Sequence, residues 1–502
     1  MGQSPIERHL PDEAATARLG EDIAAALRPG DVVALSGDLG AGKTMLARAT
    51  IRAMAGDPAL DVPSPTFTLV QAYEAGIPVW HFDLYRLAAP DELDELGFDE
   101  ATTGGVALVE WPERAAGRMP AEAIHVRLSE QGSGRRATIE AAGAALARLE
   151  RSFAVRDFLG SAGWGDAHRR FLQGDASTRA YETVEREGEA PRILMNAPRQ
   201  PDGPPIRDGK PYSQIARLAE SVVPFVAVGR ALKAAGFAAP EIFSADLDCG
   251  LLLLEHLGSG GFLDDGAPVR ERYVAAAELL ADLHGVAWNP VMPVAQGLDY
   301  TVPPYDEEAM AIETELLIEW YLPHMRGRAA TDAEREAYAA AWSKAFGELR
   351  QAEKSLVLRD YHSPNLIWRA ERSGRDRLGI LDFQDALIGP SAYDVASLSM
   401  DARVTIPPEL EAETVAAYCA ARERAGGFDR AGFERAYAIM AAQRNSKILG
   451  IFVRLNVRDG KPQYLKHLPR IRDYLARSLA HPVLAELRAL YRGFGIFEGA
   501  GA

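Results

Sequence analysis

The sequence predicts an α/β domain with a mainly parallel sheet, followed by a larger α+β unit that is built from two lobes. Three observations support this prediction. The 502 residues exceed one ordinary hydrophobic core, and about 150 residues per domain gives about three compact bodies. Strand-like runs alternate with helical stretches early in the chain, which is typical of a parallel sheet. Strand-like runs also dominate from about 171 to 258, and helical patterns dominate after Val269.

The composition excludes several classes of protein. Hydrophobic residues make up 47% and charged residues 25%, which excludes disordered, collagen-like and fibrous chains. The net charge of −16 argues against general polyanion binding, and the first 150 residues alone carry −10. Only Cys249 and Cys419 occur, so we expect no disulfide framework and no cysteine-based zinc site. The polar start and the short apolar runs predict a cytoplasmic protein with no membrane segment.

The first domain is predicted element by element from its apolar runs. Residues 31–37 form a strand pattern, and residues 45–54 form the helical pattern that follows it. Further strands are predicted over residues 67–73, 79–82, 106–109, 124–128 and 137–143. The helical stretch over residues 144–159 then leads into a different pattern. We therefore predict one domain over 1–148 and a second over 155–502, with a sheet-rich lobe (155–265) and a helical lobe (266–502).

The motif GDLGAGKT connects the first of these strands to its helix. Gly37, Gly40 and Gly42 let the backbone bend so that N–H groups point at phosphate oxygens, and the helix dipole adds positive potential. Lys43 would reach the β/γ-phosphates and Thr44 would hold Mg²⁺. A glycine-rich turn without a ligand is the alternative, which the strand–loop–helix context disfavours. The motif therefore predicts an ATP and Mg²⁺ site in a P-loop NTPase domain.

Two acids follow strands where such a site needs them. Asp83 comes directly after the strand VWHF, and Glu110 ends the strand VALVE. A carboxylate at the carboxyl end of a parallel strand can reach Mg²⁺ or its water. Taken singly, each acid would more often be a solvated surface group.

Four motifs in a fixed order strengthen the functional interpretation of Asp83 and Glu110. GDLGAGKT, SPTFTL, HFDLYRL and VEWPER follow one another in a pattern that resembles the TsaE (YjeE) family, over about residues 5–140. These are ATPases of the machinery that makes threonylcarbamoyladenosine in tRNA. The resemblance implies that Thr66 senses the nucleotide, that Asp83 serves Mg²⁺, that Glu110 acts in hydrolysis and that Trp111 packs near the nucleotide. A loop residue that caps a turn is the alternative for Thr66.

The same resemblance implies partners. TsaB- and TsaD-like subunits would handle the transfer of the threonylcarbamoyl group. Affinity for a phosphate backbone comes from Lys and Arg. A domain with a net charge of −10 is therefore poorly suited to hold tRNA by itself. We therefore expect tRNA to be contacted only indirectly.

A second set of chemical residues lies in the helical half. Asp360 and Asn365 are five positions apart in LRDYHSPNLIW, and Asp382 follows in GILDFQDAL. This is the spacing of a kinase catalytic loop and its metal-binding acid. Asp360 would accept the proton of a substrate hydroxyl, while Asn365 and Asp382 would hold Mg²⁺ against the phosphates of ATP. The two motifs together predict a protein-kinase-like, bilobal phosphotransferase.

This half resembles the aminoglycoside phosphotransferase superfamily and, within it, the AmgK group of anomeric amino-sugar kinases. GDASTRAY, ILMNAP, LVLRDYHSPNL, LDFQDAL and RNSKILGIFVRL carry the likeness. It implies that ATP phosphorylates the C1 hydroxyl of N-acetylmuramate or N-acetylglucosamine in cell-wall recycling. It also places backbone groups of Glu255 to Leu257 against adenine.

The sequence departs from the superfamily pattern at two places. Leu358 and Arg359 replace the usual His and Gly before the catalytic Asp, which we interpret as altered support of the loop. The strand around ILMNAP has no lysine for the α/β-phosphates, and Arg179 is our candidate anchor. An ordinary surface arginine is the alternative. His362 is interpreted as a loop residue that packs on the catalytic segment, and His284 as a helix-end residue with a local hydrogen bond.

Three other interpretations remain open at this point. The second half could be an aminoglycoside-type phosphotransferase, or a pseudokinase that only binds. The first half could be a nucleotide-sensing interaction module whose hydrolysis is incidental.

Overall fold

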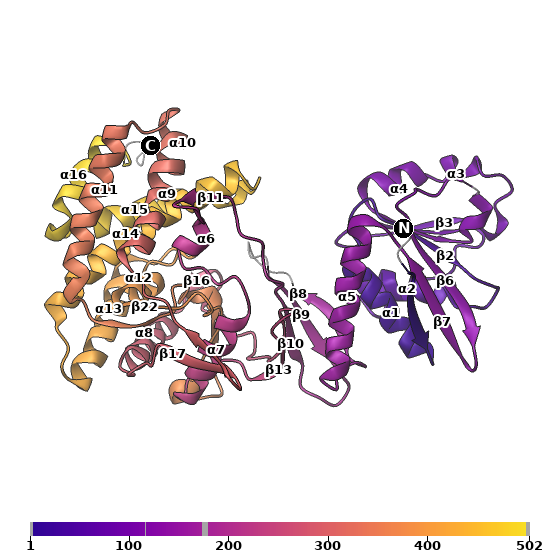
Figure 1. Cartoon of the computed structure of the whole chain (residues 1–502), viewed down its shortest axis with the longest axis horizontal. Helices are drawn as coiled ribbons and strands as arrows, with labels where there is room; N and C mark the ends of the chain where they lie inside the picture. The colour runs from indigo at the N-terminus through magenta and orange to yellow at the C-terminus, as the bar shows by residue number, and fades with distance from the viewer. Residues whose placement is uncertain (1–3, 116, 173–178, 498–502) are drawn as a thin grey trace. The chain divides into compact units, whose positions relative to one another are not determined.

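The computed structural model describes residues 4–115, 117–172 and 179–497 of the chain (Figure 1). They fall into two compact units: Met1–Ala197 with Phe243–His256, and Pro198–Ile242 with Leu257–Ala502. The predicted boundary at 148–155 lies inside one continuous helix, α5 (Gly143–Ser161). None of the helices in the described ranges has the length and apolar composition needed to span a membrane.

A seven-stranded mixed sheet forms the centre of the P-loop part of the first unit. Its strand order is β1-β7-β6-β2-β5-β4-β3. The four central strands pair in parallel, and antiparallel strands close both edges of the sheet. The strands are β1 (Ile6–Leu10), β2 (Val32–Ser36), β3 (Val70–Tyr73), β4 (Val79–Asp83), β5 (Val106–Glu110), β6 (Ile124–Gln131) and β7 (Gly134–Glu140).

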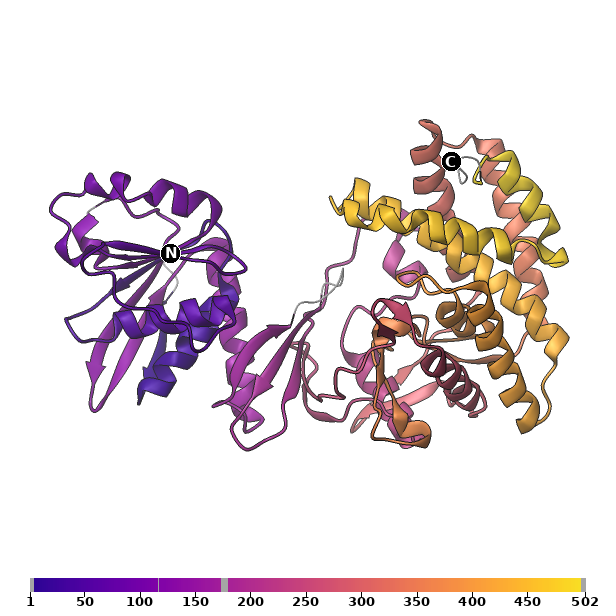
Figure 2. The same ribbon diagram turned by 180° about the vertical axis from the view of Figure 1, so that it is seen from behind.

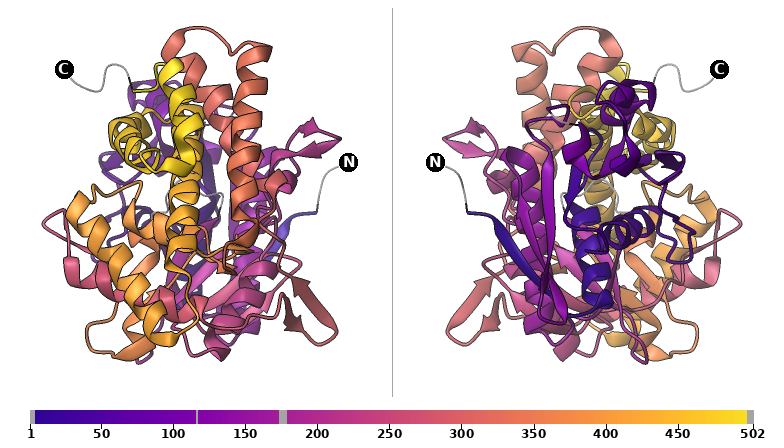
Figure 3. Two further views of the ribbon diagram at one scale, coloured as in Figure 1. Left: turned by 90° about the vertical axis from the view of Figure 1, so that its left-hand side faces the viewer. Right: turned by 90° about the vertical axis from the view of Figure 1, so that its right-hand side faces the viewer.

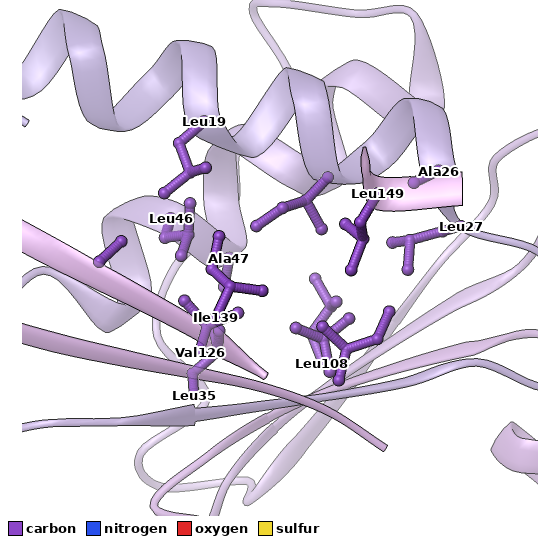
Figure 4. Close-up of a cluster of buried hydrophobic side chains, with 14 of the residues drawn as sticks. Leu19, Ala26, Leu27, Leu35, Leu46, Ala47, Leu108, Val126, Ile139 and Leu149 are labelled. Carbon is purple, nitrogen blue, oxygen red and sulfur yellow. The ribbon is translucent and has the colours of Figure 1, made fainter. Parts of the chain in front are cut away.

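Helices bury apolar side chains against this sheet. Helix α1 (Glu13–Ala26) begins where the Asp12 side chain accepts a hydrogen bond from Ala15 N, and it buries Leu19 and Ile23. Figure 4 shows Leu19 of α1, Leu46 of α2 and Leu149 of α5 converging with strand side chains. The other helices here are α2 (Lys43–Ala55), α3 (Glu92–Glu95) and α4 (Phe98–Gly104).

A second sheet of five strands belongs to the same unit. Its order is β13-β14-β10-β9-β8, and the pairs β8–β9, β9–β10 and β10–β14 are antiparallel. Its strands are β8 (His168–Leu172), β9 (Ala180–Glu185), β10 (Arg192–Asn196), β13 (Ile242–Asp246) and β14 (Leu251–Glu255). This is the sheet of the predicted small lobe.

The second unit is mainly helical, as the sequence predicts. Helix α14 (Arg430–Val457) is 28 residues long and packs against α9, α12 and α15 (Figures 2 and 3). The helices are α6 (Tyr212–Ile215), α7 (Val223–Ala234), α8 (Arg270–His284), α9 (Glu307–Leu316), α10 (Leu322–Arg326), α11 (Asp332–Gly347), α12 (Ala392–Ser399), α13 (Pro408–Ala425), α15 (Leu468–Ser478) and α16 (Ala485–Gly493).

Short strand pairs carry or flank the catalytic motifs of this unit. The pairs are β19 (Lys354–Val357) with β22 (Leu387–Pro390), and β20 (Leu366–Trp368) with β21 (Leu378–Ile380). Three further hairpins are β11 (Pro205–Arg207) with β12 (Lys210–Pro211), β15 (Leu263–Asp264) with β16 (Ala267–Pro268), and β17 (Val291–Ala295) with β18 (Leu298–Thr301). The β17–β18 hairpin was not predicted from the sequence.

Candidate active sites

The GDLGAGKT loop has the backbone shape that a phosphate site needs. Gly37, Gly40 and Gly42 have φ values of 139°, 81° and 103°, which other residues rarely adopt. A Cβ atom at position 37 would lie 2.4 Å from the carbonyl oxygen of Leu128, so only glycine fits there. Helix α2 begins directly after Gly42, and no side chain of the described residues caps it. Its first N–H groups are therefore available to an anion.

Lys43 lies folded over this loop. Its Nζ atom donates hydrogen bonds to the carbonyl oxygens of Gly37 (2.7 Å) and Asp38 (2.9 Å). The same ammonium group is 3.7 Å from the centre of the Trp111 ring. Burial lowers the pKa of Lys43, and the nearby charge of Glu110 opposes this effect. Lys43 and Trp111, both predicted at the nucleotide, thus lie together at the loop.

The two predicted acids occupy neighbouring strands. Asp83 and Glu110 are paired in the register of β4 and β5, and both are buried. Thr44 Oγ1 donates to Glu110 Oε2 at 2.9 Å. Thr66 Oγ1 donates to Asp83 Oδ2 at 2.9 Å, and Ser64 Oγ donates to the same oxygen at 2.8 Å. The structure therefore brings the predicted residues of this site together.

His81 belongs to this group but was not singled out from the sequence. Its Nε2 atom lies 2.9 Å from Glu110 Oε1, and its side chain is fully buried. His81 precedes Asp83 by two positions on β4, so both side chains point to the same face of the sheet. That alternation was the available signal. Ser64 was also missed, although it belongs to the SPTFTL motif.

The three polar residues of the predicted kinase site also lie close together. Asn365 Nδ2 donates to the carbonyl oxygen of Asp360 at 2.9 Å and to Asp382 Oδ2 at 3.3 Å. Gln384 Nε2 donates to the other carboxylate oxygen of Asp382 at 2.7 Å. Asp382 has a φ of 57°, so its carboxylate is presented from an uncommon backbone conformation.

Buried carboxylates hold the catalytic loop by its backbone. Asp394 accepts hydrogen bonds from the N–H groups of Leu358 (2.6 Å) and Arg359 (2.8 Å). Asp401 accepts from Ser363 N at 3.0 Å and from Ser363 Oγ at 2.5 Å. The loop is thus fixed on both sides of Asp360 by charge-assisted hydrogen bonds, which are stronger than neutral ones.

His362 in this loop and His284 at the end of α8 each lie beside one of the two acids that hold the loop. His362 is buried with Nδ1 3.5 Å from Asp401 Oδ1. His284 ends α8, where its Nδ1 atom is 2.9 Å from the Tyr418 hydroxyl and its Nε2 atom is 3.6 Å from Asp394.

Arg359, which replaces a glycine of the superfamily pattern, joins a buried ion cluster. Its guanidinium and the Lys447 ammonium both contact the Glu313 carboxylate, the latter at 2.6 Å. Burial would raise the pKa of Glu313, but these two cations outweigh it and lower the pKa to about 2. Burial would likewise raise the pKa of Asp360, whereas His362, Lys447 and Arg359 lower it below its usual value. Asp360 is therefore ionised at neutral pH, as a proton acceptor must be.

The remaining predicted residues lie on or beside the small-lobe sheet. Arg179 is partly buried and directly precedes β9, whereas Gly174 of the same motif lies outside the described residues. Glu255 ends β14 and is partly buried. Leu257 is buried in the second unit. Their roles at a nucleotide remain predictions.

Two protein families match consecutive parts of the chain. Residues 10–138 match the family described as threonylcarbamoyl adenosine biosynthesis protein TsaE. Residues 168–428 match the phosphotransferase enzyme family, which covers more than half of the chain.

Curated relatives divide in the same way. The chain is 38% identical over 354 residues to an N-acetylmuramate/N-acetylglucosamine kinase of Caulobacter vibrioides, covering 68% of this chain and 96% of that protein. It is 33% identical over 341 residues to the protein of that name from Pseudomonas aeruginosa, covering 65% of this chain and 90% of that protein. A TsaE protein of Rickettsia conorii is 46% identical over 105 residues, which are 21% of this chain and 59% of that protein. The chain is therefore an enzyme of the phosphotransferase family that carries a TsaE-family ATPase domain in front of its kinase part.

Proposed function

We propose that the protein is bifunctional, with two sites that both transfer the γ-phosphate of ATP. The first site passes it to water in support of threonylcarbamoyladenosine modification of tRNA. The second passes it to the C1 hydroxyl of N-acetylmuramate or N-acetylglucosamine in cell-wall recycling. The observation that carries this proposal is that the P-loop residues lie together in the first unit, and Asp360, Asn365 and Asp382 lie together in the second.

In the P-loop site, the chain's own groups fit a nucleotide with Mg²⁺. The loop N–H groups and Lys43 would hold the phosphates, and Trp111 would pack beside them. Thr44, Asp83 and Glu110 offer oxygen atoms, the ligands that Mg²⁺ prefers. Glu110, positioned by His81, would orient the attacking water. The charge of −10 in this part favours work through TsaB- and TsaD-like partner proteins, with tRNA contacted only indirectly.

In the kinase site, Asp360 would accept the proton of the sugar hydroxyl as the hydroxyl oxygen attacks the γ-phosphorus. The side chains of Asn365 and Asp382 contact each other, and the amide oxygen of the one and the carboxylate of the other are the kinds of ligand that would hold Mg²⁺. A bound Mg²⁺ would neutralise charge on the phosphates. Arg179 would contact phosphate in place of the missing strand lysine, and backbone groups between Glu255 and Leu257 would meet adenine.

The kinase assignment is tested with the full chain and a panel of acceptors. N-acetylmuramate, N-acetylglucosamine and aminoglycosides would each be incubated with ATP and Mg²⁺, and sugar 1-phosphate would be detected directly. We expect product from the amino sugars and none from the aminoglycosides. Aminoglycoside phosphorylation alone would support the weaker alternative. Phosphorylation of N-acetylmuramate that vanishes in Asp360→Ala would exclude a pseudokinase, whereas no phosphorylation of any acceptor would support one.

The ATPase assignment is tested by restoring tRNA modification with the partner proteins present. Glu110→Ala should abolish both phosphate release and threonylcarbamoyladenosine formation. If hydrolysis disappears but modification continues, the domain acts as a nucleotide-sensing module instead.

A further inference from the structure

Helix α5 is shared by two hydrophobic cores of the first unit. Leu149 and Phe153 are buried in the core of the P-loop domain, where Figure 4 shows Leu149 beside α1. Within the next two turns, Val155, Phe158 and Leu159 are buried beneath the small-lobe sheet. Because the helix runs without a break through both cores, the small lobe is attached to the P-loop domain by a rigid element and not by a flexible linker.

A buried group of charges, here called the Asp22 cluster, reinforces this attachment. Asp22 of α1 accepts from Arg156 Nε of α5 at 3.0 Å and from Arg169 Nη1 of β8 at 2.8 Å. Arg169 in turn makes two hydrogen bonds with Glu182 of β9, at 2.7 and 2.8 Å. Glu21 completes the cluster through Arg156 at 3.2 Å. All five side chains are at most 13% exposed.

Two residues of the Asp22 cluster lie on the strands next to Arg179, the candidate phosphate anchor. Arg169 lies on β8 and Glu182 on β9, and Arg179 directly precedes β9. The carboxylates of Glu182 and Asp22 hold opposite parts of the Arg169 guanidinium, one from the small lobe and one from the P-loop domain. A buried guanidinium keeps a fixed position only while its carboxylate partners remain.

Asp22 lies on helix α1, which is held in place by close contacts with α2 and α5. Next to it, Gly20 lies so close to α2 that a Cβ atom there would be 2.6 Å from the Cβ atom of Ala49. Ser152 Oγ also donates to the carbonyl oxygen of Asp22 at 2.6 Å, and Arg169 Nη1 lies 3.1 Å from the same Ser152 oxygen. Helices α1, α2 and α5 are therefore packed together, and α1 and α5 both contact Arg169 of β8.

We propose that Asp22, a residue of the ATPase domain, is a positioning residue for the kinase reaction, because it fixes strands β8 and β9 through Arg169. The P-loop domain is then a structural part of the kinase's nucleotide site, and not merely a second enzyme on the same chain. This inference rests on the proposed kinase function.

The test compares Asp22→Asn with Asp157→Asn in the full-length chain. Asparagine keeps the shape of the Asp22 side chain but removes its charge. Asp157 is a matched control, since it also lies in the first unit and pairs with an arginine, Arg8, but its side chain is 64% exposed. We expect Asp22→Asn to raise the KM for ATP in sugar phosphorylation at least fivefold, with the KM for the sugar changed less than twofold. Asp157→Asn should change neither value more than twofold, and Asp22→Glu should recover part of the loss.

A second readout measures nucleotide affinity without the sugar. In a Lys43→Ala background, which disables the P-loop site, a fluorescent ATP analogue would report the kinase site alone. Asp22→Asn should raise the Kd of the analogue by a similar factor. If the wild-type chain phosphorylates no sugar, the proposed kinase function fails, while this Kd comparison still decides the role of Asp22.

The proposal is overturned if folded Asp22→Asn retains the wild-type KM for ATP and the wild-type Kd. If Asp22→Asn does not fold, Ser152→Ala, which removes a neutral hydroxyl, and Arg169→Lys, which keeps the charge, replace it, with circular dichroism to check folding. Either of these variants should raise the same two constants, and unchanged constants in both would equally overturn the proposal.

Discussion

The two phosphoryl-transfer sites of this chain hold their acids in different ways. In the P-loop site, the hydroxyl groups of Thr44, Ser64 and Thr66 donate to the carboxylates of Glu110 and Asp83. In the kinase site, the catalytic loop is fixed from behind by buried carboxylates and by an ion cluster of Arg359, Glu313 and Lys447.

This difference in how the acids are held affects how each site can change when a ligand binds. A hydrogen bond between a hydroxyl and a carboxylate contributes about 1.5–3 kcal/mol net, so a bound metal ion can take its place. Breaking a buried ion pair by removing one partner costs about 3–5 kcal/mol. We therefore expect the acids of the P-loop site to exchange partners more readily on nucleotide binding than the residues that support the kinase loop.

The largest expected effect is on the kinase reaction itself. Asp360→Asn should lower kcat for sugar phosphorylation by about 10³-fold, because the proton acceptor is lost while the backbone support of the loop remains. Steady-state kinetics in the full chain would measure it. A loss below tenfold would contradict the role of Asp360 as proton acceptor.

The next effect is on stability. Glu313→Gln should lower the free energy of unfolding by about 3–5 kcal/mol, because Arg359 and Lys447 would lose their buried partner. Chemical denaturation would measure the change, with Glu315→Gln as control. Glu315 is on the same helix and pairs with Arg207, but its side chain is 29% exposed, and its pair should contribute less than about 1 kcal/mol. Equal effects of the two variants would contradict the importance of the buried cluster.

The wild-type cluster also predicts a dependence on pH. The pKa of Glu313 falls from 4.5 to about 2 in the folded state. A depressed folded pKa stabilises the protein above the unfolded pKa, so this contribution is fully present above about pH 5. It should be lost as the pH falls from about 4.5 towards 2. Glu313→Gln should remove this part of the acid transition, and an unchanged pH dependence would contradict it.

A smaller effect concerns the pH profile of the kinase. Lys447 is one of the charges that lower the pKa of Asp360, so Lys447→Met should raise this pKa and move the acidic limb of kcat/KM to higher pH. Lys447→Arg keeps the charge and should leave the limb nearly in place. Identical profiles for the methionine and arginine variants would show that the charge at this position has no influence.

The smallest effect is expected in the P-loop site. Thr66→Ala should lower the free energy of unfolding by about 1 kcal/mol or less, because Ser64 still donates to the same oxygen of Asp83. Thr68→Ala, on the exposed part of the same segment, serves as control. A loss of several kcal/mol for Thr66→Ala would show that this site is as rigid as the kinase loop.

Local motifs allowed much of both sites to be predicted. The phosphate loop follows from glycine spacing and its strand–helix context, and Asp360, Asn365 and Asp382 follow from their spacing. Glu313 and Lys447 could not be found in this way, since they are 134 positions apart and meet only through tertiary packing.

The regions near the domain boundary were harder to predict for a similar reason. A shift in sequence pattern placed the boundary at 148–155, but helical periodicity cannot show that one helix serves two cores. The first strand and α1 were also missed, although Leu19 and Ile23 have helical spacing. The overall order of an α/β domain followed by a two-lobed phosphotransferase is confirmed.

The central claim, two separate phosphoryl-transfer sites in one chain, is tested most directly by following the γ-phosphate of ATP in full-length single variants. With partner proteins and sugar present, Lys43→Ala should lose phosphate release to water but still form sugar phosphate. Asp360→Asn should show the reverse. Loss of both products in either variant would contradict the account, as would persistence of both.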